Sequence, residues 1–233
     1  MDEDLVWQAR HFVYSHIAET TRPPRVDEAA AHFGILIEEA TELYKELHNR
    51  HALFLDLDEM AIRMTNPFSG IPTDFKVHAN GKTYFANCAW DMLGIPAALH
   101  CDAFIDAVCT ESNDTIRLEI KDRKIFAQGG APAAEEGGLS KLLVHFPLPF
   151  SRWYDDLVFT CATMLLFRSE EWVDKWCKRH TLERGEMLSL QQVWELSKLW
   201  YGNRMSLEYH GRSMEQVAEI FKQAGLASKF WYL

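Results

Sequence analysis

The residue pair best suited to chemistry is Cys88 with Asp91, three positions apart in the stretch FANCAWDML. A strand-like TYFAN precedes the pair and CAWDMLG is typical of a helix start, so we expect both side chains on one side of a first helical turn. The free amides and the dipole of a helix N-terminus favour anions, and the Cys88 thiol is therefore expected to ionise more readily than a free thiol. A neighbouring carboxylate opposes that ionisation, which suits a group that accepts or delivers a proton or contacts a bound cation. These nine residues also fit a structural role, with Asp91 satisfying first-turn amides and Cys88 packed inside.

A second thiol, Cys161, lies in the continuous apolar run LVFTCATMLLF. We interpret this run as a buried strand, although its length does not separate a strand from a buried helix. A buried thiol stays protonated and inert unless a soft cation or another thiol stabilises its thiolate. Two thiols in a dry pocket favour soft metals such as Cu(I), Zn(II) or Hg(II). The long separation along the chain leaves open whether Cys88 and Cys161 meet.

Residues 1–65 are predicted to form a winged-helix-like helical module. Apolar residues at helical spacing indicate a helix over 5–20, and TTRPPR ends it because proline and its predecessor resist the α conformation. VDEAAAHFG and ILIEEATELYKELHNR predict two more helices, and ALFLDLDEMAIRM predicts a hairpin. The third helix carries four glutamates that would repel phosphates, so we interpret the module as scaffold or lid and not as a DNA reader.

Residues 66–205 are predicted to form an antiparallel-sheet core with flanking helices. Asn80-Gly81, between the alternating runs of FKVHANGKTYFA, is a strong hairpin signal. FIDAVCT, TIRLEIKDRKIF and KLLVHFPLP predict further strands, and EEWVDKWCKRH and SLQQVWELSKLWYGNR predict helices. Helices, then strands, then helices indicate the α+β class. Residues 206–233 are predicted to be a helical extension with a capping box at Ser213, and its terminal KFWYL would close the core, cap the pocket or form an interface.

Composition excludes several classes of function. The net charge of −10, from 34 acidic and 24 basic residues, argues against nucleic acid or an anionic membrane surface as the main partner, but leaves room for a local basic patch. The chain has no run of roughly 20 apolar residues and begins with the acidic MDEDLVWQAR, so we expect a cytoplasmic protein without a membrane partner. Five cysteines without a CxxC pair are expected to be free thiols. GxSxG, HExxH, Walker and GxGxxG motifs do not occur.

Two stretches around these thiols share the order and spacing of their residues with a known family. The first is NPFSGIPTDFKVHANGKTYFANCAWDMLGIPAALHCDAFIDAVC, with an aromatic-Ala-x-Cys-Ala-x-Asp box between a hairpin and an Ile-Pro pair. The second is FTCATMLLFRSEEW, which KRH and SLQQVWEL continue. Together they resemble the core of the organomercurial (alkylmercury) lyase family over residues 60–205. The resemblance implies an organomercurial-lyase-like fold.

The resemblance assigns Cys88 and Cys161 as the thiols that capture mercury and Asp91 as the carboxylate that helps to move a proton. It implies cleavage of carbon–mercury bonds by protonolysis, in which sulfur binds the soft metal while a proton reaches the departing carbon. No cofactor is expected to be required. Hg(II) is the expected bound product, held by the two cysteines and Asp91. Low-molecular-weight thiols such as glutathione are the expected co-reactants that remove it, in a role in mercuric resistance.

The sequence also departs from the family pattern, which leaves the substrate open. Trp90 stands where a smaller aliphatic residue is expected, Ala162 follows Cys161 where some members have another cysteine, and the extension at 206–233 exceeds the shortest family versions. One alternative is a homologue that cleaves another carbon–heteroatom bond with the same thiols. Another is a non-enzymatic protein that binds Cu(I) or Hg(II). The remaining cysteines are expected to be structural or merely tolerated; they are Cys101, Cys109 and Cys177.

Overall fold

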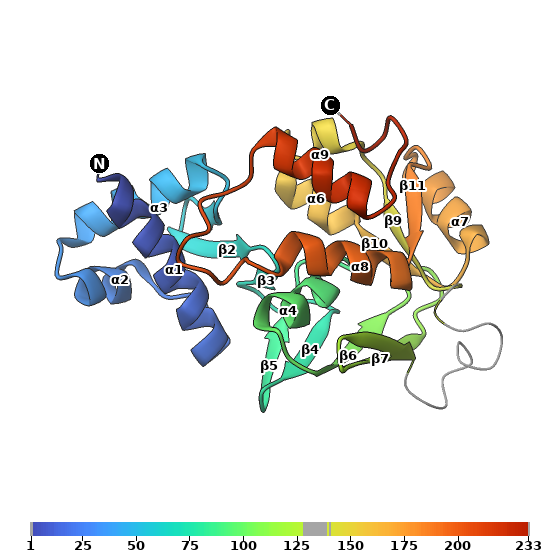
Figure 1. The fold of residues 1–233 in the computed structure, drawn as a ribbon, viewed down its shortest axis with the longest axis horizontal. Coiled ribbons are helices and arrows are strands. Elements are labelled where there is room, and N and C mark those ends of the chain that lie inside the picture. The colour runs from blue at the N-terminus through green and yellow to red at the C-terminus, as the bar shows by residue number, and fades with distance from the viewer. Residues whose placement is uncertain (1, 128–138, 140, 233) are drawn as a thin grey trace.

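The computed structural model describes residues 2–127, 139 and 141–232. Helices come first, antiparallel strands occupy the middle of the chain and helices return at its end, as the colours of Figure 1 show. This order of elements confirms the α+β class. In the residues that the structure describes, no helix is both long and apolar enough to span a membrane.

The N-terminal part contains three helices and a small antiparallel sheet. The helices are α1 (Glu3–Thr20), α2 (Val26–Phe33) and α3 (Ile37–Asn49), and the strands are β1 (Phe54–Asp56), β2 (Ala61–Thr65) and β3 (Phe68–Ser69), in the order β1-β2-β3. The predicted helices and hairpin are therefore present. Strand β3 pairs with β2 and extends the sheet beyond residue 65, so the N-terminal part and the core share hydrogen-bonded structure.

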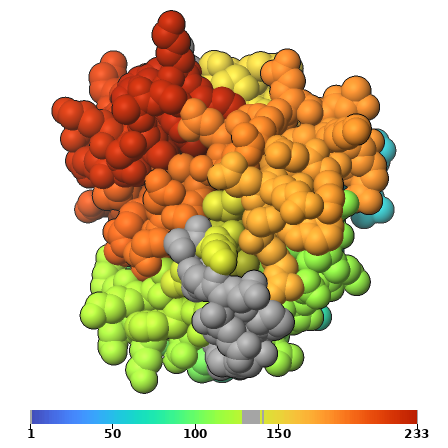
Figure 2. All heavy atoms as spheres, turned by 90° about the vertical axis from the view of Figure 1, so that its right-hand side faces the viewer, coloured from blue at the N-terminus to red at the C-terminus, as the bar shows by residue number. Residues whose placement is uncertain are grey.

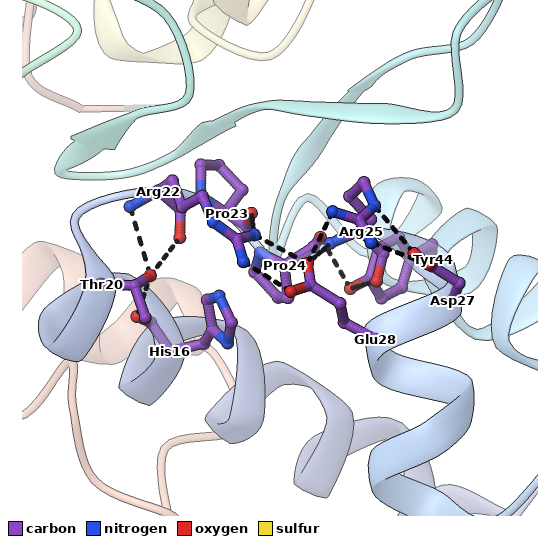
Figure 3. A network of polar contacts seen from close by, with 9 residues as sticks. All are labelled: His16, Thr20, Arg22, Pro23, Pro24, Arg25, Asp27, Glu28 and Tyr44. Carbon is purple, nitrogen blue, oxygen red and sulfur yellow. Dashed lines mark hydrogen bonds and ion pairs between the residues drawn. The ribbon is translucent and has the colours of Figure 1, made fainter.

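The connection between α1 and α2 is held by polar contacts (Figure 3). Arg22 binds both carboxylate oxygens of Glu28, at 2.7 and 2.5 Å, and the Tyr44 hydroxyl of α3 donates to the Pro24 carbonyl at 3.1 Å. A bidentate guanidinium–carboxylate pair fixes both position and angle. These contacts join the connector after α1 to α2 and α3, and α1 itself contributes residues to the candidate site described below.

The central sheet has five antiparallel strands in the order β5-β4-β6-β7-β8. They are β4 (Lys76–Ala79), β5 (Lys82–Phe85), β6 (Ala103–Val108), β7 (Thr115–Lys121) and β8 (Lys124–Ala127). Asn80 and Gly81 form the β4–β5 turn with φ values of 52° and 73°, the left-handed values that a two-residue hairpin turn favours. Alternate residues of β6 and β7 are buried, so one face of this sheet packs on the core.

A second antiparallel sheet and the remaining helices complete the fold. Its strands, in the order β10-β9-β11, are β9 (Leu143–Phe146), β10 (Leu165–Phe167) and β11 (Glu186–Ser189). The helices are α4 (Asp91–Leu99), the 3-10 segment η2 (Phe150–Arg152), α6 (Leu157–Thr163), α7 (Glu170–His180), α8 (Leu190–Tyr201) and α9 (Met214–Gln223). Helix α4, which follows Cys88, packs against α8 in the centre of the molecule.

The predicted buried strand over LVFTCATMLLF is wrong for its first part. Helix α6 takes this segment as far as Thr163, and only Leu165–Phe167 form strand β10. The Asp156 carboxylate accepts the Phe159 amide at 2.9 Å, and such an N-cap starts a helix that the length of an apolar run does not reveal. Cys161 therefore lies on a helix.

The C-terminal extension packs onto the core. Ser213 and Gln216 form the predicted capping box of α9, with hydrogen bonds of 3.3 and 2.9 Å. Trp231 is 1% exposed, and its ring lies 5.0 Å from that of Phe146, so the terminal aromatic cluster closes the core. Figure 2 shows the C-terminal segment, in red, lying against the orange residues that precede it.

Candidate active site

Cys88 lies in a tight turn between strand β5 and helix α4. The helix itself begins at Asp91, three residues later than the sequence predicts, but the Met92 amide already donates to the Cys88 carbonyl at 3.1 Å. The Asp91 amide donates to the Cys88 sulfur at 3.4 Å. The turn thus places the thiol just before the helix and the carboxylate at its first residue, and the two groups lie close together, as their spacing predicts.

Cys161 meets this pair from helix α6. The sulfur atoms of both cysteines and a carboxylate oxygen of Asp91 all lie within 4.8 Å of one another. A backbone hydrogen bond of 3.0 Å from the Ala89 amide to the Met164 carbonyl joins the Cys88 turn to the end of α6. Cys88, Asp91 and Cys161 are 1%, 0% and 3% exposed. The structure therefore brings together the three residues that the sequence singled out, in a buried cluster.

Three polar side chains that the sequence analysis missed hold Asp91. The Tyr201 hydroxyl of α8 donates to Asp91 Oδ1 at 2.5 Å, and the Asn87 amide donates to Oδ2 at 2.9 Å. Asn66 Nδ2 lies 3.3 Å from Asp91 Oδ2 and 3.5 Å from the Cys161 sulfur, so it contacts the carboxylate and a thiol together. Asn66 and Asn87 lie within the stretches that resemble the family, next to Pro67 and Cys88, whereas nothing in the sequence marks Tyr201.

The predicted easy ionisation of Cys88 is wrong. Burial, together with the neighbouring Cys161 and Asp91, holds the pKa of the Cys88 thiol well above its usual value. The cost of removing the thiolate from water outweighs the stabilisation from the single amide hydrogen bond that the sulfur accepts. A thiolate at this position would also face the Asp91 carboxylate. Burial also raises the pKa of Asp91 to about 6, although hydrogen bonds from Tyr201 and Asn87 pull it down. The cluster thus holds a protonated thiol next to a carboxyl group that titrates near neutrality.

A cavity of about 770 Å³ opens onto the cluster. Its walls come from α1, α6, the end of α8 and the connector to α9, which Figure 1 shows running from α8 past α1 and back to α9. Trp90 lines the cavity within an aromatic group, with ring centroids 5.3 Å from Trp200 and 5.5 Å from Trp153 and Tyr201. The large residue at position 90 therefore packs into the wall beside the thiols.

Close packing of Gly94 keeps Tyr201 in place. A Cβ atom at Gly94 would lie 2.6 Å from the Tyr201 ring and 2.8 Å from Pro67. We expect Gly94→Ala to lower the free energy of unfolding by about 1–3 kcal/mol, because overpacking forces neighbouring groups to move. Urea unfolding of Gly94→Ala in the wild-type and in a Tyr201→Ala background measures this. The cost should be smaller where the ring is absent, and equal costs would contradict the assignment.

The sequence of the chain places it among known proteins. A family model described as MerB, alkylmercury lyase, matches residues 68–202, more than half of the chain. The chain belongs to the alkylmercury lyase family. The chain is also similar to a solved structure, the crystal structure of the mercury-bound form of MerB2, with a TM-score of 0.67 and 22% sequence identity. The match covers 88% of this chain and 93% of the MerB2 chain. No curated protein matches this alkylmercury lyase family member by sequence.

The other cysteines of this alkylmercury lyase family member do not line the cavity. Cys109 is fully buried and Cys101 is partly buried. The Cys177 sulfur lies 3.8 Å from His145 Nε2 in a separate small cluster with Phe167 and Trp176. Cys88 and Cys161 are thus the two cysteines that reach the cavity among the residues the structure describes.

Proposed function

We propose that this member of the alkylmercury lyase family cleaves carbon–mercury bonds by protonolysis, with Cys88, Asp91 and Cys161 as catalytic residues. One observation carries the proposal: two sulfurs and a carboxylate lie within 4.8 Å of one another, buried beside a cavity. Sulfur is a soft ligand that favours Hg(II), and a carboxyl group that titrates near neutrality suits proton transfer. The mercury-bound state of the structurally similar MerB2 supports mercury as the metal.

In the proposed reaction, an organomercurial R–Hg–X first exchanges X for one cysteine sulfur, and X leaves with the thiol proton as HX. The second thiol then gives its proton to the Asp91 carboxylate as its sulfur binds mercury. Asp91 passes this proton to carbon, the electron pair of the carbon–mercury bond goes with carbon, and R–H departs. Hg(II) remains on both sulfurs, Asp91 is a carboxylate again, and nothing is oxidised or reduced.

Release of Hg(II) needs a competing ligand, since two buried thiolates hold it. We propose low-molecular-weight thiols as co-reactants that take over the metal by ligand exchange, and no resident cofactor. Five free cysteines are compatible with a cytoplasmic site of action, where such thiols are abundant and reduced.

Phenylmercury with an excess of cysteine tests the proposal. We expect benzene in the headspace, measured by gas chromatography against a protein-free control. Stoichiometric mercury binding without benzene would favour the alternative of a soft-metal binding protein, which uses the same two thiols. If no benzene is released and no mercury is bound, the remaining alternative is a homologue that cleaves another carbon–heteroatom bond.

The pH profile of cleavage tests the part played by Tyr201, which we propose as a positioning residue for Asp91. Asp91 must be ionised to accept a proton, so kcat/KM is expected to fall as the pH drops through about 6. The Tyr201 hydrogen bond favours the ionised form, and Tyr201→Phe should therefore raise the pKa of Asp91 and move this fall to higher pH. A purely structural role would lower activity without moving the profile.

We also propose the division of the chain that its sequence suggests: a module at 1–65, a lyase-like core at 66–205 and an extension at 206–233. The core supplies the three catalytic candidates. The module and the extension would supply much of the cavity wall, including Arg10 of α1 and Arg212 before α9.

A further inference from the structure

Three arginines converge on one tyrosine at the wall of the cavity. Arg204 and Arg212 each donate to the Tyr209 hydroxyl at 2.7 Å, and the Arg10 guanidinium lies 4.5 Å from the centre of the Tyr209 ring. All four residues line the cavity. They come from α1 and from the connector between α8 and α9, so this arginine cluster forms where α1 meets that connector.

The arginine cluster has no acidic partner among the residues that the structure describes. No ion pair to Arg10, Arg204 or Arg212 is found within 4.0 Å in the described part of the chain, while eight other arginines are paired. Asp91 is the single acidic residue among those that line the cavity. A chain with a net charge of −10 thus gathers positive charge without a carboxylate partner on the wall of one cavity. Buried charge without a counter-ion is costly, which favours an anionic ligand there.

The donors of the cluster are only partly used. Arg10 is 1% exposed and donates to the carbonyl oxygens of Arg204 and Ser206, and Arg212 donates to the Trp200 carbonyl and the Asn203 side chain. The buried Nε of Arg204 has no partner among the described residues. The Tyr209 hydroxyl accepts two hydrogen bonds and donates none among the described residues. Burial lowers the pKa of Arg212 to about 10, so its guanidinium stays charged at neutral pH. Positive charge and an unused hydroxyl donor on Tyr209 are therefore present together at the cavity wall.

We propose that the arginine cluster is a subsite for the carboxylate of a small molecule whose other end reaches Cys88 and Cys161. The thiols and the arginine cluster line one and the same cavity, which places them in one continuous site. Guanidinium groups bind carboxylates through paired charge-assisted hydrogen bonds, and the aromatic wall suits an aryl group between the two ends. The choice of substrate rests on the proposed function. If the protein is a lyase, it should prefer organomercurials whose organic group carries a carboxylate over neutral organomercurials.

Mercury-free binding tests the subsite independently of cleavage. Titration calorimetry should show benzoate binding about tenfold or more tightly than its neutral isostere benzamide, with affinity that falls as NaCl is added. Arg212→Gln should remove most of this preference, whereas Arg117→Gln, an exposed arginine on β7, should retain it. Arg212→Lys keeps the positive charge and should retain part of the preference for benzoate. This variant therefore distinguishes the loss of the charge from a loss of folding. Equal affinity for benzoate and benzamide, or benzoate binding unchanged in Arg212→Gln, would overturn the proposal even if cleavage is normal.

Two further experiments show whether the bound carboxylate belongs to the substrate or to the thiol co-reactant. If it belongs to the substrate, 4-(chloromercuri)benzoate should exceed phenylmercury in kcat/KM, by a ratio that Arg212→Gln lowers about tenfold. If it belongs to the thiol co-reactant, mercaptoacetate should remove Hg(II) faster than 2-mercaptoethanol, again in a way that depends on Arg212. Either pattern supports the subsite, and the first supports our choice of substrate.

Discussion

Serine in place of Cys161 is expected to reduce kcat/KM for phenylmercury by a factor on the order of 10³ or more. The hydroxyl is nearly the same size and can still accept from Asn66, so the helix and its packing should persist. What is lost is a soft ligand for mercury and a proton that the second thiol supplies. Benzene release in the presence of excess cysteine measures the effect.

The matched variants make this result specific. Cys88→Ser should be as severe, and the double variant little worse than either single one, because residues that act as a unit give strongly non-additive losses. Cys177→Ser should keep activity, since that thiol packs beside His145 outside the cavity. Normal cleavage by Cys161→Ser, or equal losses in all three single variants, would remove the thiol-pair mechanism.

Local sequence signals predicted most of the elements but not how the site is buried. The Asn80-Gly81 turn, the Ser213 capping box and the amphipathic helices depend on neighbours in sequence, and the structure confirms them. The prediction of a strand around Cys161 is wrong because an apolar run indicates burial but not the type of element. The helix there starts at the N-cap Asp156. Elements that short-range chemistry determines could therefore be read from the sequence.

The environment of the site could not be read in the same way. The predicted easy ionisation of Cys88 rests on the helix start alone and omits desolvation, which depends on tertiary contacts such as that with Cys161 of α6. Tyr201 reaches Asp91 from more than a hundred residues away, and no spacing rule connects them. The arginine cluster likewise depends on α1 meeting the connector before α9. Only the family resemblance predicted that Cys88 and Cys161 would meet.

Asparagine in place of Asp91 is expected to separate metal capture from cleavage. The amide keeps the shape of the carboxylate and can still accept from Tyr201, but it cannot take a proton from a thiol. Both sulfurs remain, so Hg(II) should bind with its thiolate charge-transfer absorbance intact. Release of benzene should fall by a factor of about 10² to 10⁴, the usual contribution of a positioned acid or base.

The same variant has a stability signature that checks the burial of Asp91. The pKa of this carboxyl group is raised from 3.8 to about 6 in the folded protein, so its stabilising contribution is complete below about pH 4 and is lost as the pH rises through 6. The loss amounts to about 3 kcal/mol, as two pKa units correspond to that free energy. Asp91→Asn does not titrate, and its urea unfolding should lack this part of the pH dependence. Alanine is a poorer choice, because it leaves the Tyr201 hydroxyl without an acceptor, whereas the asparagine oxygen keeps one. If Asp91→Asn cleaved phenylmercury at the wild-type rate, or lost Hg(II) binding along with cleavage, the carboxylate would not be the proton carrier, and the acid would have to be sought among the thiols themselves.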